Sequence, residues 1–264
     1  MKYIFFLFTG LLLLLTSCKD IVDFYIGIPL QPATDENSFI PGLNIFGIIR
    51  PDSTEVYNNS FIVLQKVIPA VGSSDSLDVD TTSVRIEKIN APESTYVFFL
   101  THYDHVFRED EYRPDLNFRP QAGDIYTVEC VYRDLPVLTA RTIVPNVPVI
   151  RMNTITETEN SLSFEIQPDT SIFMFDIYIY AAGKLAGYQR LPGEQANGTP
   201  VLFNSLQGRA DSIDIYSYDY NMALYYMTSN TSLNFNKYRE SFSIVENGYG
   251  VFGALNHGRF YLKK

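Results

Sequence analysis

Short apolar stretches separated by turn signals run through most of the chain, and they constrain the fold more than any other feature. Residues 161–166 (SLSFEI) and 83–89 (SVRIEKI) alternate apolar and polar side chains, which is the period of a strand with one buried face. Residues 125–132 (IYTVECVY) alternate in the same way and place Cys130 on one face with Val128, as expected of a small buried side chain. Strands at this spacing, without a long helical period, predict an all-β protein.

The stretch of residues 173–181 predicts a strand with two different faces. One face carries Phe173, Phe175, Ile177 and Ile179, and the other carries Met174, Asp176, Tyr178 and Tyr180. The chain has no Trp but 19 Tyr and 19 Phe, a composition that favours strands. Tyrosine combines an apolar ring with a polar tip, so a surplus of it is also typical of recognition surfaces.

Two prolines within residues 145–148 (PNVP) mark a predicted domain boundary, because proline stiffens the chain and removes a hydrogen-bond donor. We therefore expect two tandem immunoglobulin-like β-sandwich domains, residues 39–146 and residues 147–264. Helical spacing is found near residues 218–229, in the second domain. It predicts one short helix there, with Ser217 as its cap.

The first residues, 1–17, have the composition of a bacterial secretory signal peptide. Lys2 precedes an apolar run that is shorter than the roughly 20 residues needed to span a bilayer. Residues 15–18 (LTSC) resemble the lipobox, in which a peptidase cuts before an obligatory cysteine. In that interpretation the chain is cleaved between Ser17 and Cys18, and Cys18 carries acyl chains such as palmitate on its sulfur and its amine. The alternative is an ordinary signal peptide with a coincidental cysteine.

Residues 18–38 are expected to form a lipidated tether. Lys19 and Asp20 are similar to the signal that exports Bacteroidota lipoproteins to the outer leaflet of the outer membrane. They predict a cell-surface protein that is anchored in the outer membrane, with a periplasm-facing position as the alternative. The net charge of −10 argues against a nucleic-acid partner. Only Cys130 remains beside Cys18, so no intramolecular disulfide is expected.

His102, Asp104 and His105 come nearest to a site with chemistry of its own. Two histidines and an aspartate can bind a transition metal, but a strand or loop does not aim such neighbours at one point. The favoured interpretation is a solvated loop, without a metal or any other cofactor. The chain lacks a nucleophile-elbow motif and a phosphate-binding loop, and no carboxylate pair stands out among its 30 acidic residues. We therefore expect a non-enzymatic protein and rank a hydrolase last.

The tail around residues 246–254 (ENGYGVFGA) carries the most specific motif. Its members are Glu246, Asn247, Gly248, Gly250, Phe252 and Gly253. Glycines allow a positive φ or a close backbone approach, and Phe252 between them can fill a core. The expected role is structural, as a bulged strand that closes the second sandwich. A ligand-binding loop is the alternative.

Three pieces of the sequence together resemble the Bacteroidota lipoproteins grouped as "domain of unknown function 4249". They are the lipobox with the first strands, residues 123–128 (GDIYTV) continuing into residues 139–145 (TARTIVP), and the tail with the Tyr-rich helical stretch before it. Tyr249 and Leu255 depart from the family pattern. The resemblance implies a surface lipoprotein that is paired with a TonB-dependent outer-membrane receptor, and it brings no catalytic residues.

Two functions from different classes therefore stay open. The first is a binding accessory to a TonB-dependent receptor in nutrient capture, with an unknown ligand. The second is a structural adhesin or a fimbrial-type anchor subunit, because those chains are also lipidated tandem sandwiches. A fimbrial precursor is expected to carry a basic cleavage site before an early strand, and Arg50 is a possible single cut.

Overall fold

The computed structural model describes residues 41–52, 58–67, 79, 81–89, 94–101, 111–196, 198–229 and 244–262. Strands dominate these residues, and two short α-helices complete the regular structure apart from one 3-10 turn. The prediction of an all-β protein is therefore confirmed. The described part of the chain contains no helix that is long and apolar enough to cross a membrane.

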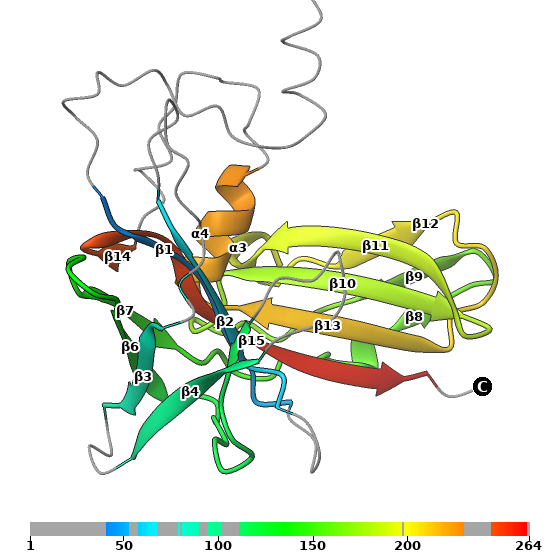
Figure 1. Ribbon diagram of the computed structural model, residues 1–264. Helices are drawn as coiled ribbons and strands as arrows, with labels where there is room; N and C mark the ends of the chain where they lie inside the picture. The colour runs from blue at the N-terminus through cyan, green and yellow to red at the C-terminus, as the bar shows by residue number, and fades with distance from the viewer. Residues whose placement is uncertain are drawn as a thin grey trace, which may run out of the picture.

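The elements follow one another along the chain as Figure 1 labels them. The N-terminal part contains β1 (Leu43–Ile49), β2 (Phe61–Lys66), β3 (Ser83–Lys88), β4 (Thr95–Thr101), β5 (Glu111–Arg113), β6 (Ile125–Val131) and β7 (Leu138–Ile143). The C-terminal part contains η2 (Met152–Thr154), β8 (Thr156–Glu157), β9 (Ser161–Phe164), β10 (Met174–Ala181), β11 (Lys184–Pro192), α3 (Gly193–Ala196), β12 (Val201–Asn204), β13 (Ser212–Tyr218), α4 (Tyr220–Ser229), β14 (Val245–Glu246) and β15 (Gly248–Tyr261). The strand order is β11-β10-β13-β15-β1-β2-β5-β4-β3-β6-β7-β14 in the larger sheet and β12-β9-β8 in the smaller one.

The N-terminal lobe consists of β1 to β7 and is completed by β14 and the first part of β15. These strands surround one hydrophobic core. Phe118 is fully buried there, and its ring meets Tyr96, Phe98 and Tyr126 edge-on at centroid distances of 4.8, 5.4 and 5.3 Å. Cys130 belongs to the same core, as its place in the alternating pattern predicts.

The C-terminal lobe is built from two sheets around a second core. β11, β10, β13 and the second part of β15 form one sheet, and β8, β9 and β12 form the other, behind it in Figure 1. Ile177 of β10 shares this core with Leu162 and Phe164 of β9. The predicted two-faced strand at residues 173–181 is thus confirmed, except that Phe173 precedes β10 and is exposed.

Strand β15 is shared by the two lobes. Its residues 248–254 pair in parallel with β1, and its residues 255–261 pair antiparallel with β13. A turn at Asn247, with a φ of 57°, leads into it from β14, which pairs with β7. Because Phe252 and Ala254 lie in the core of the N-terminal lobe, the prediction that the tail closes the second sandwich is wrong for its first part. That part supplies a wall of the first lobe.

The junction between the lobes is filled by helix α4 and a small core of its own. This core includes Ile48 of β1, Met174 of β10, Met222 of α4, and Val251 and Leu255 of β15. Apolar contacts thus continue from one lobe into the other through β15.

Asp219, and not the predicted Ser217, caps helix α4. The Oδ1 atom of Asp219 accepts a hydrogen bond from the backbone N–H of Met222 at 2.9 Å, which satisfies a donor at the start of the helix. Ser217 still belongs to β13, and its hydroxyl donates to the carbonyl oxygen of Asn146 at 2.8 Å. The sequence correctly predicts α4 as a helix, but it misses α3, which has a single turn.

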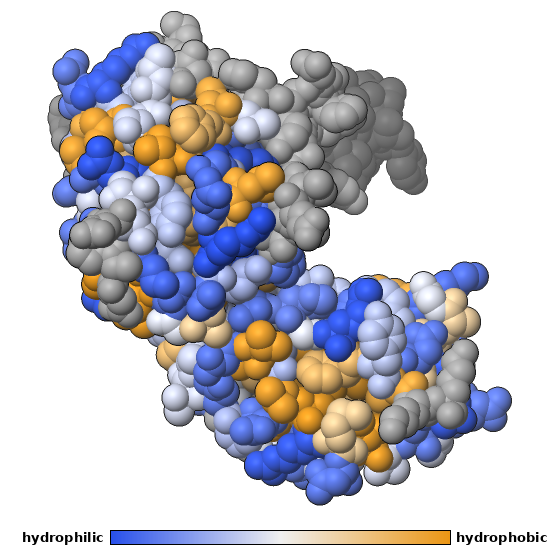
Figure 2. Space-filling model, turned by 90° about the horizontal axis from the view of Figure 1, so that it is seen from below, coloured by the Kyte–Doolittle hydropathy of each residue, from blue (hydrophilic) through white to orange (hydrophobic). Residues whose placement is uncertain are grey.

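The two lobes meet at an angle, and Figure 2 shows an open hollow on one side of the molecule between them. The outer face of β10, β11 and β13 is turned toward the viewer in Figure 1 and borders this hollow. Its side chains are therefore placed where another molecule can approach from solvent.

Candidate functional site: a tyrosine-rich sheet face

Strand alternation places a set of tyrosines on the outer face of the C-terminal sheet. The inward side chains of β10, such as Ile177 and Ile179, fill the core, so Asp176, Tyr178 and Tyr180 point outward. The pairing registers bring residues of β11, β13 and β15 to the same face. We call this surface the tyrosine face, and its aromatic members are Tyr178, Tyr180, Tyr188, Tyr216, Tyr218, His257 and Tyr261.

The rings of the tyrosine face contact one another across neighbouring strands. Tyr178 of β10 lies 5.0 Å from Tyr188 of β11 and 5.8 Å from Tyr216 of β13, measured between ring centroids. Tyr216 in turn stacks on His257 of β15 at 4.6 Å. Tyr188 and Tyr261 are 49% and 71% exposed, whereas Tyr178 and Tyr216 are partly buried. The face therefore presents both ring surface and hydroxyl groups to solvent.

Asp176 organises one half of the tyrosine face. It is only 1% exposed, and its two oxygens accept hydrogen bonds from Nε and Nη2 of Arg190, both at 2.7 Å. The hydroxyl groups of Tyr188 and Tyr218 donate to the same carboxylate at 3.0 and 2.9 Å. Such a bidentate, charge-assisted pair compensates the buried charge. It also fixes the positions of one arginine and two tyrosines.

Four phenol groups of the face, those of Tyr178, Tyr188, Tyr216 and Tyr218, have raised pKa values and stay protonated at physiological pH. Burial, followed by the negative charge of Asp176, raises the pKa of Tyr188 to about 12 and raises the pKa of Tyr218 still further. Burial likewise raises the pKa of Tyr178 and of Tyr216. Because a desolvated phenol resists ionisation, these groups act as neutral hydroxyls.

Asp214 organises the other half of the face. It is 2% exposed, and Nε of Arg259 donates to its Oδ1 at 2.6 Å while Nη2 donates to Oδ2. The Nε2 atom of His257 lies 3.7 Å from Oδ2 of Asp214 and has no hydrogen-bond partner among the described residues. Burial lowers the pKa of His257, so its imidazole is neutral at pH 7.

A third ion pair borders the face where β1 ends. Nε of Arg50 donates to Oδ1 of Asp52 at 2.9 Å, and the guanidinium carbon of Arg50 lies 6.0 Å from the ring centroid of Tyr216. Three guanidinium groups on and beside the face are thus matched by three carboxylates. The surface is polar, but its formal charges cancel.

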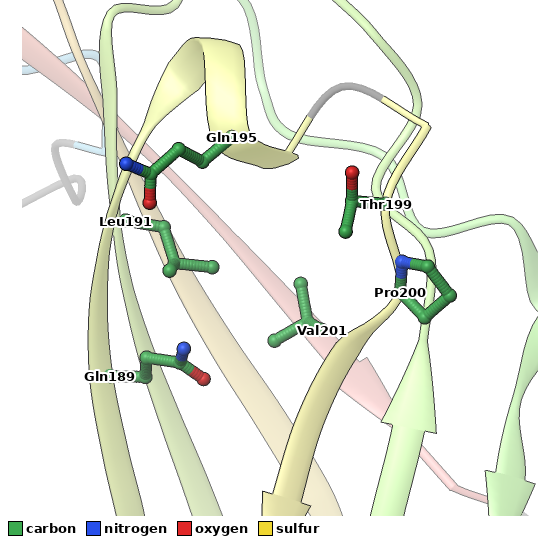
Figure 3. Close-up of a pocket in the computed structure, with 6 residues that line it drawn as sticks. All are labelled: Gln189, Leu191, Gln195, Thr199, Pro200 and Val201. Carbon is green, nitrogen blue, oxygen red and sulfur yellow. The ribbon is translucent and has the colours of Figure 1, made fainter.

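A second candidate is an open pocket at the edge of the C-terminal lobe, between β11, α3 and β12 (Figure 3). It has a volume of about 400 Å³, and its lining residues are Gln189, Leu191, Gln195, Thr199, Pro200 and Val201. Leu191 and Val201 point into it from opposite sides. Since the lining contains no acid or base, the pocket has no groups for proton transfer, and the tyrosine face is the stronger candidate.

The residues predicted to carry the anchor and a metal lie outside the described residues. These are Ser17, Cys18, Lys19, Asp20, His102, Asp104 and His105. Within the described ranges, no group of three His, Cys, Asp or Glu side chains could hold a metal ion. Cys130 is fully buried, and desolvation raises the pKa of its thiol to about 12, which makes it a poor nucleophile.

The tail motif begins with two side chains that bind β7 and the residue before it. The Oε2 atom of Glu246 accepts a hydrogen bond from the hydroxyl of Thr139 at 3.3 Å, and Nδ2 of Asn247 donates to the carbonyl oxygen of Val137 at 3.2 Å. These contacts hold β14 against the N-terminal lobe.

The glycines of the motif allow β15 to lie close to its neighbours. Gly250 has a φ of 99°, and a Cβ there would overlap the carbonyl oxygen of Ile45. A Cβ on Gly248 would collide with the side chain of Leu138 on β7 and with the backbone of β1, and one on Gly253 would collide with Met222 of α4. Phe252 between them is fully buried. In the structure these residues hold the strand in place.

The sequence analysis missed the residues that form the ion pairs of the tyrosine face. Asp176 interrupts an otherwise aromatic and aliphatic strand, and a buried carboxylate there requires a cation. The sequence does not say which cation, because Arg190 and Arg259 reach their partners through strand registers that depend on the fold.

The chain matches no protein-family model and none of the curated proteins.

Proposed function

We propose that the protein is a non-enzymatic lipoprotein of the outer-membrane surface that captures a ligand with its tyrosine face. The observation that carries this proposal is the buried Asp176, which holds Arg190, Tyr188 and Tyr218 in one arrangement. An aromatic surface that is fixed before it meets its ligand loses little conformational entropy on binding. Tyrosine suits this role because it combines contact area with only two rotatable side-chain bonds.

In this proposal the protein is anchored in the outer membrane by a lipid at its N-terminus. The signal peptide is removed after Ser17, Cys18 is acylated, and Lys19 with Asp20 directs the protein to the cell surface. Residues 18–38 then form the tether for two immunoglobulin-like sandwiches. The support for this part is the lipobox and the all-β architecture with two cores.

The proposed partner is a TonB-dependent outer-membrane receptor, to which the protein passes its ligand. This part rests on the resemblance of the sequence to Bacteroidota surface lipoproteins. The hollow between the lobes in Figure 2 offers room for a ligand beside the tyrosine face.

The test is a pull-down of the lipidated, C-terminally tagged protein from gently solubilised envelopes of its own host. A TonB-dependent barrel at near-equal amount is the expected result. A Cys18→Ser variant, which cannot be lipidated, serves as the control and should lose the barrel. A double Lys19→Ala, Asp20→Ala variant should keep the lipid but lose cleavage by protease added to intact cells.

A structural adhesin of the fimbrial type remains the second candidate, and one observation favours it. Strand β11 ends the larger sheet, so among the described residues its outer edge has no strand partner. Exposed edges of this kind accept an added strand from another subunit. Recovery of pilin-like subunits, or of no partner from cells in which the protein is protease-accessible, would overturn the receptor-accessory function in favour of this one.

A further inference from the structure

We infer that the tyrosine face binds an uncharged carbohydrate chain. The inference rests on the proposed function, since it names the ligand class of the same surface. Three properties of the face lead to it: the arrangement of the rings, the state of the hydroxyl groups and the balance of charge.

The rings form an uneven platform that crosses the strands, in which Tyr178 is tilted by 40° to Tyr188 and by 86° to Tyr216. Tyr188, Tyr178 and Tyr216 come from three adjacent strands and contact in sequence, and His257 from the fourth strand stacks on Tyr216. Neighbouring strands are about 4.8 Å apart, so aromatic groups recur at short, regular steps across the sheet. A sugar ring has one C–H-rich face that packs against an aromatic ring. One sugar can therefore pack on the exposed ring of Tyr188, while the next sugars of the chain meet the ring edges and hydroxyl groups of Tyr178 and Tyr216.

The hydroxyl groups of the platform are free to bind sugar hydroxyls. Among the described residues, the phenol groups of Tyr178, Tyr180 and Tyr216 make no hydrogen bond within the protein, and all three side chains are partly exposed. A phenol both donates and accepts, as a sugar hydroxyl does. The hydroxyl of Tyr188 already donates to Asp176, so it remains available as an acceptor.

The balance of charge disfavours ionic ligands. Arg190 and Arg259 each bind a nearly fully buried aspartate through two hydrogen bonds, and Arg50 is paired with Asp52. The charge of each guanidinium group is thus matched by a carboxylate, which leaves the face without net positive charge for a uronic acid, a sulfate or a phosphate. A ligand without charge loses no ionic hydration on this surface, whereas a charged one would lose hydration without gaining an ion pair.

The experiment is binding of the detergent-solubilised lipidated protein to a printed glycan array that spans neutral, uronic-acid, sulfated and sialylated chains. We expect binding confined to neutral chains. The dissociation constant for the best of them should change less than about twofold between low and high salt, because screening acts on charged ligands.

Three variants of the tyrosine face and one control variant assign the binding to this face. Tyr178→Ala and Tyr188→Ala should each weaken binding to the best neutral glycan roughly tenfold, as expected for the loss of one stacked ring. Tyr188→Phe keeps the ring and should stay within about threefold. Phe99→Ala removes a 61% exposed aromatic side chain from β4 in the other lobe and should leave binding unchanged. Unfolding midpoints of all four variants show whether the fold is intact.

Several results would overturn the inference. They are binding to acidic glycans alone, binding to no neutral glycan, preference for peptides over glycans, or neutral-glycan binding that survives Tyr178→Ala in a folded protein. Recovery of the barrel in the pull-down without glycan binding would overturn the inference and leave the proposed function standing. Glycan binding by the tyrosine face without recovery of a barrel would support the inference and overturn the proposed role as an accessory to a TonB-dependent receptor.

Discussion

At the scale of single residues, Asp219 connects α4 and β7 through one carboxylate. Its Oδ1 caps α4 through the N–H of Met222, and its Oδ2 accepts a hydrogen bond from the hydroxyl of Thr142 on β7 at 2.6 Å. The side chain is buried at the junction of the lobes. Desolvation outweighs these hydrogen bonds and raises the pKa of Asp219 to about 6.

The raised pKa of Asp219 predicts in which direction the stability of the protein changes with pH. The folded protein holds this proton more tightly than the unfolded chain, whose aspartate titrates near 3.8. The stabilisation is therefore complete below pH about 4 and is lost as the pH rises through about 6. Relative to Asp219→Asn, the wild-type free energy of unfolding should rise by up to about 3 kcal/mol as the pH falls from about 8 to about 4. Urea unfolding of both proteins across this range measures the difference, and parallel curves would contradict the assignment.

Asp176 gives a second prediction at the same scale. Asp176→Asn leaves the Arg190 guanidinium without its counter-charge in a largely buried site, so we expect a loss of about 2–4 kcal/mol in the free energy of unfolding. The matched control is Glu165→Gln, which breaks the more exposed pair with Arg151 and should cost less than about 1 kcal/mol. Denaturant unfolding measures both losses. Equal losses of free energy of unfolding in the two variants would show that Asp176 contributes no more to stability than a carboxylate in an exposed ion pair.

Residue alternation predicts which side chains of β10 face outward, but it does not predict their partners. The face with Asp176, Tyr178 and Tyr180 follows from a period of two within one strand. The pairing of Asp176 with Arg190 requires the hairpin register of β10 and β11, which shifts at a bulge between Ile179 and Tyr180. Local patterns therefore predict the tyrosine face in part, and its ion pairs depend on non-local geometry.

At the scale of elements, β15 shows even more clearly that a local sequence pattern does not predict a distant partner. The sequence predicts a bulged strand with structural glycines near residues 246–254, and a strand is present there. Its parallel partner β1 lies at the other end of the described chain. No local period identifies a partner so far away, and the expectation of a neighbour in the second sandwich followed from sequence proximity alone.

Gly250 provides the test of how tightly β15 is held. Gly250→Ala combines an unfavourable φ of 99° with overlap against the backbone of β1, so we expect a loss of about 3 kcal/mol or more. Gly198→Ala is the matched control, because Gly198 has a φ of 70° but no heavy atom within 4 Å of an added Cβ. It should cost only about 1 kcal/mol, from backbone conformation. Thermal or denaturant unfolding that ranks the two variants equally would contradict a close approach at Gly250.

At the scale of the whole molecule, the two cores depend on the chain in different ways. The core of the C-terminal lobe is drawn entirely from Ile150 and later residues. The core of the N-terminal lobe needs Val245, Phe252 and Ala254 from the tail. The predicted boundary near Asn146 therefore separates most of the strands but not the cores.

This asymmetry predicts different behaviour of two fragments. A fragment of residues 39–146 should fail to fold, because it lacks the wall that β14 and β15 supply. A fragment of residues 147–264 should fold, because it keeps its core whole. Dispersion of amide signals in NMR spectra distinguishes the outcomes. Adding a peptide of residues 244–255 to the first fragment should restore dispersion, and a well-dispersed spectrum without the peptide would refute the dependence.

The pairing of β1 with β15 also fixes the order in which the chain can acquire its structure. Leu43 and Gly248 are roughly 200 residues apart, so at usual synthesis rates β1 waits about 10–40 s for its partner. During that delay the first lobe cannot be completed, and pairings over such distances are slow to form. If the first 17 residues act as the predicted export signal, the chain would reach the translocation machinery with its first lobe incomplete and still able to be threaded. Folding of that lobe would then be completed only after β15 had crossed.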